Sequence, residues 1–205
     1  HLLEKGHEVV ALDHCAYAID CVEACAAELK LQAKLLTVHG GFDQLPTTGD
    51  FDCVIMSFNA LLCLDANGKQ TVFLAIARAL KPGGCFLFDL YDSEAFLNAD
   101  EPDDEPWLSE PEFLKAVSIE GVVYEIYQSG TFWSAQERIV MHYDHFPEDS
   151  EDPDEALTYE IVHHLISLEG LQEMINVSNL KIGGIRQHEF EGSTHLFVRV
   201  EKQAF

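Results

Sequence analysis

Apolar residues follow two alternating patterns along residues 1–92. Short, nearly continuous apolar runs predict buried strands at 8–12, 35–38, 51–57 and 85–90. Between these runs, apolar residues recur at helical spacing, which predicts amphipathic helices at 16–30 and 69–80. Strands that alternate with helices are typical of a parallel sheet with helical crossovers. Residues 1–92 are therefore predicted to form the core of a doubly wound, mostly parallel α/β fold.

The pattern changes after this core. Residues 89–114 are acidic and rich in proline, which predicts an exposed connector. Strand-like segments follow at 122–127, 138–143 and 157–166. We expect residues 93–166 to form an inserted antiparallel β region that acts as a lid after the fifth strand.

The C-terminal residues 167–205 predict one helix and a pair of strands. Ser167 is placed to cap a helix over residues 168–178. The segments 182–190 and 195–200 flank a short polar turn, which is typical of a β-hairpin. We expect this antiparallel hairpin to complete the core sheet.

The charge of the chain narrows its range of partners. The 205 residues include 36 acidic and 12 basic side chains, for a formal net charge of −24. Such a surface repels phosphate backbones and anionic lipid, so we expect neither nucleic acid nor membrane as a partner. The longest nearly apolar run, 53–64, is too short for a membrane helix.

The six cysteines indicate a reducing environment. Their spacing matches no zinc-binding pattern, so we expect no metal site. Cys53 and Cys85 lie inside apolar runs and are expected to be buried as free thiols. No signal peptide is visible, and we expect a cytoplasmic protein.

Three strand ends carry residues suited to a nucleoside ligand, because ligands of doubly wound sheets bind beyond the carboxyl ends of the strands. Asp13 ends the first strand, where a carboxylate can accept hydrogen bonds from both ribose hydroxyls or cap the next helix. Gly40-Gly41-Phe42 ends the second strand, where small residues admit an adenine edge or form a simple turn. Ser57-Phe58-Asn59 ends the third strand and faces a reacting centre or caps a helix.

Four segments together resemble class I (Rossmann-like) S-adenosylmethionine-dependent methyltransferases. Gly6–Asp13 is similar to the second strand of that family, and Gly40–Pro46 to the loop after its third strand. Phe51–Ser57 resembles the fourth strand. Ala79–Gly84, which contains Lys-Pro-Gly-Gly before an apolar strand, is the most specific match.

The resemblance implies a cofactor, S-adenosyl-L-methionine, whose product is S-adenosyl-L-homocysteine, and a small-molecule methyl acceptor as partner. It implies that Asp13 holds the ribose, that His14 lies beside the adenine, and that Gly41 and Phe42 lie at the adenine edge. It also implies a group of residues near the methionine part and the methyl group, namely Ser57, Phe58 and Asn59. The oligomeric state stays open, with a homodimer as one option.

Two features depart from the family. In that family a glycine-rich loop follows the first strand of the fold, which would precede the strand that ends at Asp13. This sequence has no segment that matches that strand, and since no glycines occur as Gly-x-Gly it has no match to the loop. We therefore expect an N-terminally truncated chain or a true loss of the loop. Gly41 also stands where the family has an acidic residue, so that contact is lost or supplied by Asp43.

The insertion supplies candidates for acceptor binding. Its aromatic residues either line an acceptor pocket or form the insertion's own core. Histidine is suited to act as a general base near neutral pH. His142 and His145 point to opposite faces of a strand, as do His163 and His164, so one of each pair can face a pocket. We select His142 and His164 as candidate bases.

Two alternatives to a methyltransferase remain at this point. One is a non-catalytic methyltransferase-like binding protein that has lost the cofactor loop. The other is an NAD-dependent oxidoreductase, which shares the alternating pattern and a ribose-binding Asp13. Lys-Pro-Gly-Gly before the fifth strand and the helix-plus-hairpin ending count against the oxidoreductase.

Overall fold

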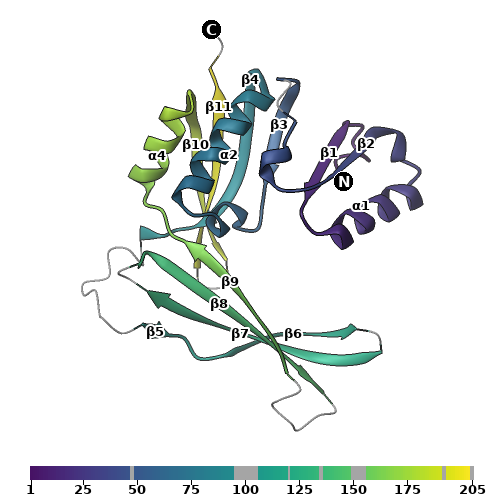
Figure 1. The fold of residues 1–205 in the computed structure, drawn as a ribbon, viewed down its shortest axis with the longest axis vertical. Coiled ribbons are helices and arrows are strands. Elements are labelled where there is room, and N and C mark those ends of the chain that lie inside the picture. The colour runs from purple at the N-terminus through teal and green to yellow at the C-terminus, as the bar shows by residue number, and fades with distance from the viewer. Residues whose placement is uncertain are drawn as a thin grey trace.

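The computed structural model describes residues 1–46, 49–94, 106–119, 121–133, 136–148, 156–190 and 193–203. The chain is built from an α/β part and an antiparallel sheet that lies across one end of it (Figure 1). The mixed α/β class predicted from the sequence is confirmed. The predicted single core sheet is divided, because the strands of the α/β part form a two-stranded and a four-stranded sheet.

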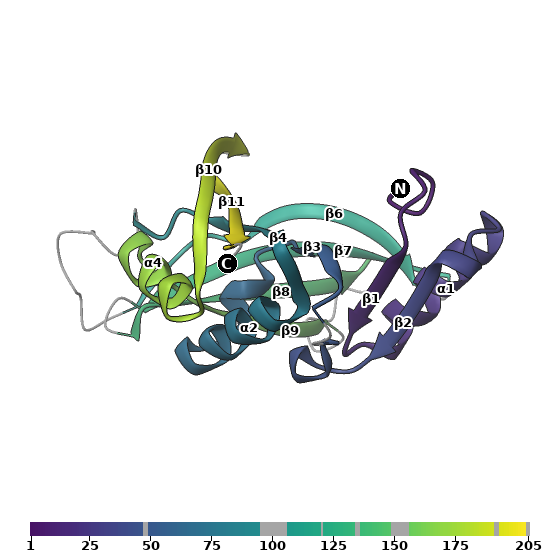
Figure 2. The same ribbon diagram turned by 90° about the horizontal axis from the view of Figure 1, so that it is seen from above.

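The two-stranded sheet and its helix form an N-terminal lobe. Strand β1 (Val9–Asp13) pairs in parallel with β2 (Leu35–His39). Helix α1 (Ala16–Glu28) connects them and buries Ile19 and Ala26. In two perpendicular views β1 lies between β2 and β3 (Phe51–Met56) (Figures 1 and 2). Among the described strands, β1 pairs with β2 alone and β3 with β4 alone, so the edges that β1 and β3 turn toward each other are unpaired.

The four-stranded sheet has the order β10-β11-β4-β3. Strand β4 (Leu80–Tyr91) is parallel to β3 and antiparallel to β11 (Ser193–Lys202), which forms a hairpin with β10 (Leu180–Phe190). Helices α2 (Ala66–Ala79) and α4 (Leu168–Val177) pack on one face. The buried core between sheet and helices includes Phe73, Ile76, Phe86, Phe88, Leu171, Ile175, Leu196 and Val198.

The opposite face of this sheet is much more exposed than the sequence predicts. Ile55 is 53% exposed and Phe197 is 51% exposed. Cys53, expected to be buried, is exposed, and Cys85 beside it is only partly covered. The continuous apolar runs were interpreted as strands covered on both faces, as in most parallel sheets. In the described part of the chain, α2 and α4 cover one face only.

The antiparallel sheet consists of strands that the insertion contributes. Its members are β5 (Trp107–Leu108), β6 (Glu112–Ile119), β7 (Val122–Trp133), β8 (Arg138–Pro147) and β9 (Leu157–His164). The order is β5-β7-β8-β9, and β6 also pairs with β7. The predicted connector at 89–114 is wrong at its C-terminal end, because β6 begins at Glu112. Residues 95–105 of that connector lie outside the described residues.

Local sequence signals explain how several elements begin and end. The Asp65 side chain accepts a hydrogen bond from Gly68 N at the start of α2, and the Ser167 side chain accepts one from Gly170 N at the start of α4, as predicted. None of the described helices combines the length and apolar character needed to cross a membrane.

The Lys-Pro-Gly-Gly motif joins α2 directly to β4. The helix ends at Ala79 and the strand begins at Leu80, so β4 runs through the motif. Gly83 has a φ of +80°. A Cβ on Gly84 would lie 3.0 Å from the carbonyl oxygens of Lys81 and Phe51. Glycine therefore allows β4 to approach β3 closely at a register shift between Phe51 and Cys53.

We expect Gly84→Ala to lower the free energy of unfolding by about 1–3 kcal/mol, because the added methyl meets backbone atoms that cannot move aside independently. Urea unfolding monitored by circular dichroism measures this change. Gly184→Ala is the matched control, since a Cβ there meets nothing within 4 Å. Equal stability of the two variants would contradict the role of Gly84.

Candidate functional site

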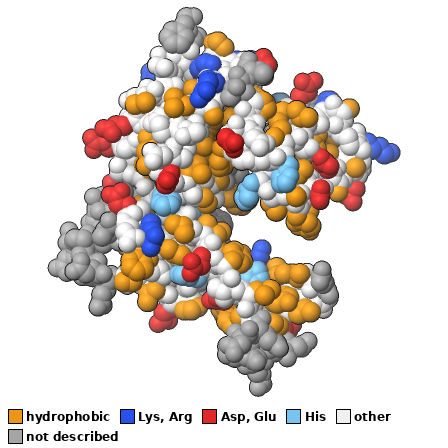
Figure 3. Space-filling view, in the orientation of Figure 1, with side chains coloured by type: hydrophobic (Ala, Val, Ile, Leu, Met, Phe, Trp, Pro, Cys, Tyr) orange, Lys and Arg blue, Asp and Glu red, His pale blue; other side chains and the backbone are white. Residues whose placement is uncertain are grey.

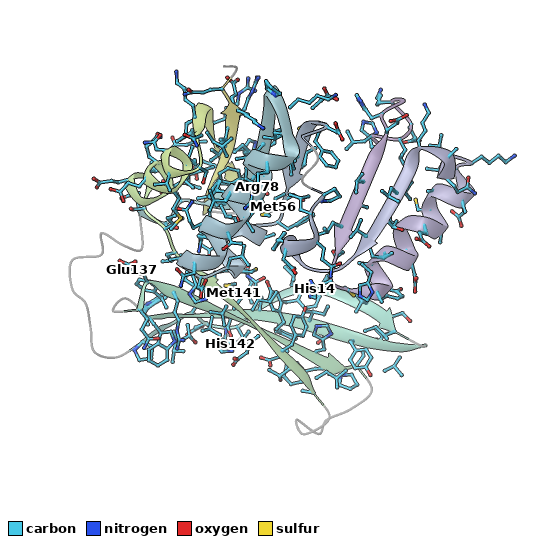
Figure 4. The ribbon with its side chains drawn as sticks, turned by 45° about the horizontal axis from the view of Figure 1, so that its top comes forward. His14, Met56, Arg78, Glu137, Met141 and His142 are labelled. Carbon is cyan, nitrogen blue, oxygen red and sulfur yellow. The ribbon has the colours of Figure 1, made fainter. Side chains whose placement is uncertain are left out.

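The carboxyl ends of the parallel strands face the antiparallel sheet, and the molecule is hollowed between that sheet and the N-terminal lobe (Figures 1 and 3). His14, just past β1, lies on the same side of the antiparallel sheet as Met141, whereas His142 projects from the other side (Figure 4). The candidate site is this cleft. Its upper wall carries the predicted cofactor residues and its floor is the antiparallel sheet.

Asp13 forms a local turn just before α1. Its Oδ1 accepts a hydrogen bond of 2.8 Å from Cys15 N, but Cys15 is itself the N-cap residue and no side chain caps the helix. The His14 Nδ1 lies 3.6 Å from the same oxygen. The Asp13 side chain is still 46% exposed, and among the described residues its Oδ2 has no hydrogen-bond partner. One carboxylate oxygen therefore remains open to the cleft.

The loop after β2 is held close to β1. Gly40 N donates a hydrogen bond of 2.9 Å to the Asp13 carbonyl oxygen, which sets the end of β2 beside the end of β1. Gly41 precedes a short 3-10 helix, Phe42–Gln44. Phe42 is half-buried, and with Leu45 it packs against the main core and lines a small apolar pocket. The structure thus brings Gly41 to the site edge and gives Phe42 a packing role.

The segment after β3 has an unusual backbone. Phe58 and Asn59 both have positive φ, at 61° and 55°, although neither is glycine. Such conformations cost free energy and concentrate at functional sites. The Phe58 side chain is 90% exposed. The Ser57 carbonyl accepts a hydrogen bond of 3.4 Å from Ala60 N, so the segment closes as a turn.

The protein supplies hydrogen-bond partners for only some of the polar atoms of Asn59. Its backbone N donates to Asp89 Oδ2 at 3.4 Å, which ties the end of β3 to β4. Its Oδ1 is buried and has no hydrogen-bond partner in the described part of the chain. A buried polar atom without a partner is costly and is often completed by a ligand or water. The strained turn and this oxygen together make the end of β3 a candidate binding position.

A buried polar pair joins β4 to the antiparallel sheet. The Tyr91 hydroxyl and His163 Nδ1 are 2.8 Å apart and hydrogen-bonded. Burial lowers the pKa of His163 from 6.5 to about 4, and the neighbouring Lys69 charge adds to this effect. Burial also raises the pKa of Tyr91. Both groups are therefore neutral near pH 7.

Lys69 forms a second connection at the same junction. The residue is 1% exposed, and its Nζ donates to the Leu64 carbonyl and, at 2.8 Å, to the His164 carbonyl. Burial lowers the pKa of Lys69 to about 8. The ammonium group links the start of α2 to the end of β9 and has no path to act on a substrate in the cleft.

The two histidines selected as candidate bases lie on the far face of the antiparallel sheet. The ring of His142 contacts Thr131 Oγ1 at 2.8 Å and Glu160 Oε1 at 3.1 Å, so both nitrogens are engaged there. His164 pairs with Arg138, which shares that face. Its backbone carbonyl, not its ring, accepts from Lys69. The structure instead turns His145 and His163 toward the α/β part.

Sequence reasoning did not single out Tyr91, Asp89 or Lys69 as site residues. Tyr91 and Asp89 stand at the end of the apolar run that forms β4, and ligands bind beyond such ends. That position was a usable signal. No local sequence pattern indicates that Lys69 is buried, because its burial depends on β9, which is distant in the sequence.

The comparisons with known proteins agree with this fold. The described α/β architecture defines a Rossmann-like mixed α/β protein. The CcbJ methyltransferase from Streptomyces caelestis has a similar structure, with a TM-score of 0.75 and 17% identity over 99% of this chain and 78% of that one. A S-adenosylmethionine-dependent methyltransferase from Clostridium acetobutylicum gives a TM-score of 0.72 and 16% identity, with 99% and 78% coverage.

Sequence comparison matches part of the chain to methyltransferases. A family model described as a methyltransferase domain matches residues 1–84. A cypemycin N-terminal methyltransferase from a Streptomyces species is 34% identical over 99 residues, which span 48% of this chain and 39% of that relative. Residues 1–84 therefore resemble a methyltransferase domain, as the sequence analysis predicts.

The pKa of His163 predicts how stability depends on pH. Because its pKa is about 4 in the folded state and near 6.5 when unfolded, the unfolded state binds more protons between these values. Stability is complete above the unfolded pKa and falls as the pH drops toward 4. We expect a loss of up to about 3 kcal/mol from this residue.

Urea unfolding of the wild type and of His163→Phe at about pH 7 and about pH 4.5 measures this contribution. The wild type should lose more stability on acidification than the variant. His188→Gln, at an exposed position of the hairpin, is the control and should follow the wild type. An identical loss in His163→Phe would show that this histidine does not control the acid response.

Proposed function

We propose that the protein is a S-adenosylmethionine-dependent methyltransferase that transfers a methyl group to a small-molecule acceptor. The observation that carries the proposal is the strained Phe58-Asn59 turn with its buried, unpartnered Asn59 Oδ1 at the end of β3. The turn lies in a chain whose residues 1–84 match a methyltransferase domain. The structural relatives named above, which are methyltransferases, support the same activity.

The residues at the strand ends fit such a cofactor. The open Oδ2 of Asp13 is suited to accept hydrogen bonds from ribose hydroxyls, and the exposed His14 ring is suited to lie beside the adenine. Gly41 leaves room for the adenine edge. Three residues after β3 would hold the methionine part, with the Asn59 amide oxygen as acceptor for its ammonium group: Ser57, Phe58 and Asn59.

The chain's own residues would align the reactants rather than react covalently. S-adenosylmethionine, when bound, supplies a methyl group already activated on a sulfonium. The exposed Phe58 ring and the floor of the cleft would exclude water from the acceptor. Holding the acceptor in a defined orientation is the main contribution that this arrangement can make. His142 and His164 face away from the cleft, so the fold assigns them no proton transfer.

A non-catalytic binding protein is the second candidate. Within the given residues no glycines occur as Gly-x-Gly, and among the described strands none lies between β1 and β3. The described part of the chain therefore has no glycine-rich loop at this position to surround the methionine part. An NAD-dependent oxidoreductase has no such support, and NAD serves as a control ligand.

Calorimetric titration with S-adenosylhomocysteine tests the proposal. We expect binding, and a dissociation constant raised at least about tenfold in Asp13→Asn, because a charge-assisted hydrogen bond is lost. Asparagine can still accept the bond from Cys15 N, so the start of α1 is retained. Asp20→Asn, at an exposed position of α1, is the control. Binding of NAD but not S-adenosylhomocysteine, or no binding by folded protein, would refute the proposal.

A further inference from the structure

The register of the antiparallel sheet determines which side chains form the floor of the cleft. Tyr91 and Met141 both pack against the cluster that contains Phe132 and Ile139, and Tyr91 bonds His163, so these sheet residues point toward the α/β part. Side chains alternate along a strand, and directly paired residues share a face. No register shift interrupts the pairing of β7 with β8 or of β8 with β9. The same face therefore continues outward through Gln128, Tyr143, Tyr159, His145 and Tyr124.

These outer residues form an aromatic floor, which we define as Tyr124, Tyr143, His145 and Tyr159. The Tyr143 and Tyr159 rings are stacked, with centroids 5.0 Å apart and an interplanar angle of 13°. His145 lies 5.2 Å from Tyr159 and 6.5 Å from Tyr124. Tyr159 is 47% exposed, so part of this aromatic surface is open.

The floor also contains a polar atom that the protein leaves unsatisfied. The His145 Nε2 is buried and has no hydrogen-bond partner among the described residues. A buried polar atom without a partner is uncommon in a finished interior. The floor therefore contains a nitrogen that is free to bond a ligand.

Charge is segregated between the two faces of β7, β8 and β9, whereas β6 places Glu112 and Lys115 on the floor side through their pairing with Gln128 and Ile126. The described charged residues of β7, β8 and β9 all lie on the far face: Glu125, Arg138, Asp144 and Glu160. The floor carries no lysine or arginine within these strands. Lys69, at the junction, is buried and bonded to two carbonyls. Across the cleft, carboxylates stand at Asp13 and Asp89.

We propose that the methyl acceptor is an organic amine, bound over the tyrosine rings of the aromatic floor as an ammonium ion. It would lose one proton to solvent before its nitrogen lone pair takes the methyl group from the sulfonium, which leaves as the thioether S-adenosylhomocysteine. Tyrosine rings attract a cation through their electron-rich faces. The carboxylates opposite, and the formal net charge of −24, add a field that favours cations. On this side of the sheet the one lysine of β6, Lys115, is accompanied by Glu112 on the same strand. The role of the amine as methyl acceptor rests on the proposed methyltransferase function, whereas the cation site itself does not.

Choline and its neutral isostere 3,3-dimethylbutan-1-ol provide the test, with affinities measured by nuclear magnetic resonance titration. We expect choline to bind at least about tenfold more tightly. Tyr143→Leu and Tyr159→Leu should remove this preference, whereas Tyr159→Phe should keep it, because phenylalanine retains a ring face. Equal affinity for the two probes, or a preference unchanged in both leucine variants, would overturn the inference.

A matched pair of lysine variants guards against misfolding of the leucine variants. Gln128 and Ser129 are neighbours on β7 that face opposite sides of the sheet. Gln128→Lys adds a positive charge to the floor and should abolish choline binding, whereas Ser129→Lys adds the same charge to the far face and should not. Loss in both variants, or in neither, would contradict the placement of the site.

A parallel titration with S-adenosylhomocysteine separates this inference from the proposed function. Gln128→Lys should bind S-adenosylhomocysteine as the wild type does. Choline preference without any S-adenosylhomocysteine binding would keep the cation site and refute the methyltransferase. Binding of S-adenosylhomocysteine without a choline preference would support the methyltransferase and refute an amine acceptor.

Discussion

The placement of the antiparallel sheet depends on the buried polar junction formed by Tyr91, His163 and Lys69. Each of these groups would be costly to bury alone, because an unpaired polar group or charge loses its hydration. The Tyr91–His163 bond and the two carbonyl partners of Lys69 remove that cost in a single arrangement. Apolar contacts around Phe132 and Ile139 are less directional. The polar junction therefore sets the orientation of the sheet, and with it the shape of the cleft.

The upper wall of the cleft is organised differently. The end of β3 is tied to β4, the strand that carries Tyr91, through Asn59 and Asp89. The ends of β1 and β2 are tied to each other through Asp13 and Gly40, and among the described strands β1 does not pair with β3. The candidate cofactor residues therefore come from two sheets, which are linked by Phe42 and Leu45 packing against the main core. A ligand that contacts both Asp13 and Asn59 would add a further link between these sheets.

Local signals in the sequence were sufficient for the elements and not for their contacts. The helices at 16–30 and 69–80 and the Ser167 cap follow from spacing and side-chain chemistry. The exposure of Cys53 could not be predicted, because it depends on which face of the sheet the helices cover. The Tyr91–His163 bond joins residues 72 positions apart, and no local pattern encodes that pairing.

The histidines of the insertion show where such reasoning ends. The alternation of side chains along a strand correctly divides His142 from His145 and His163 from His164. It does not say which member of each pair faces the cleft, since either face of an isolated sheet is possible. The contact with Tyr91 decides this for His163, and the unbroken register of β8 and β9 extends the decision to His145. Once one residue of a regular sheet is placed, every other side chain on its face is placed as well, and the row of tyrosines on the cleft side of β7, β8 and β9 then acquires a chemical meaning.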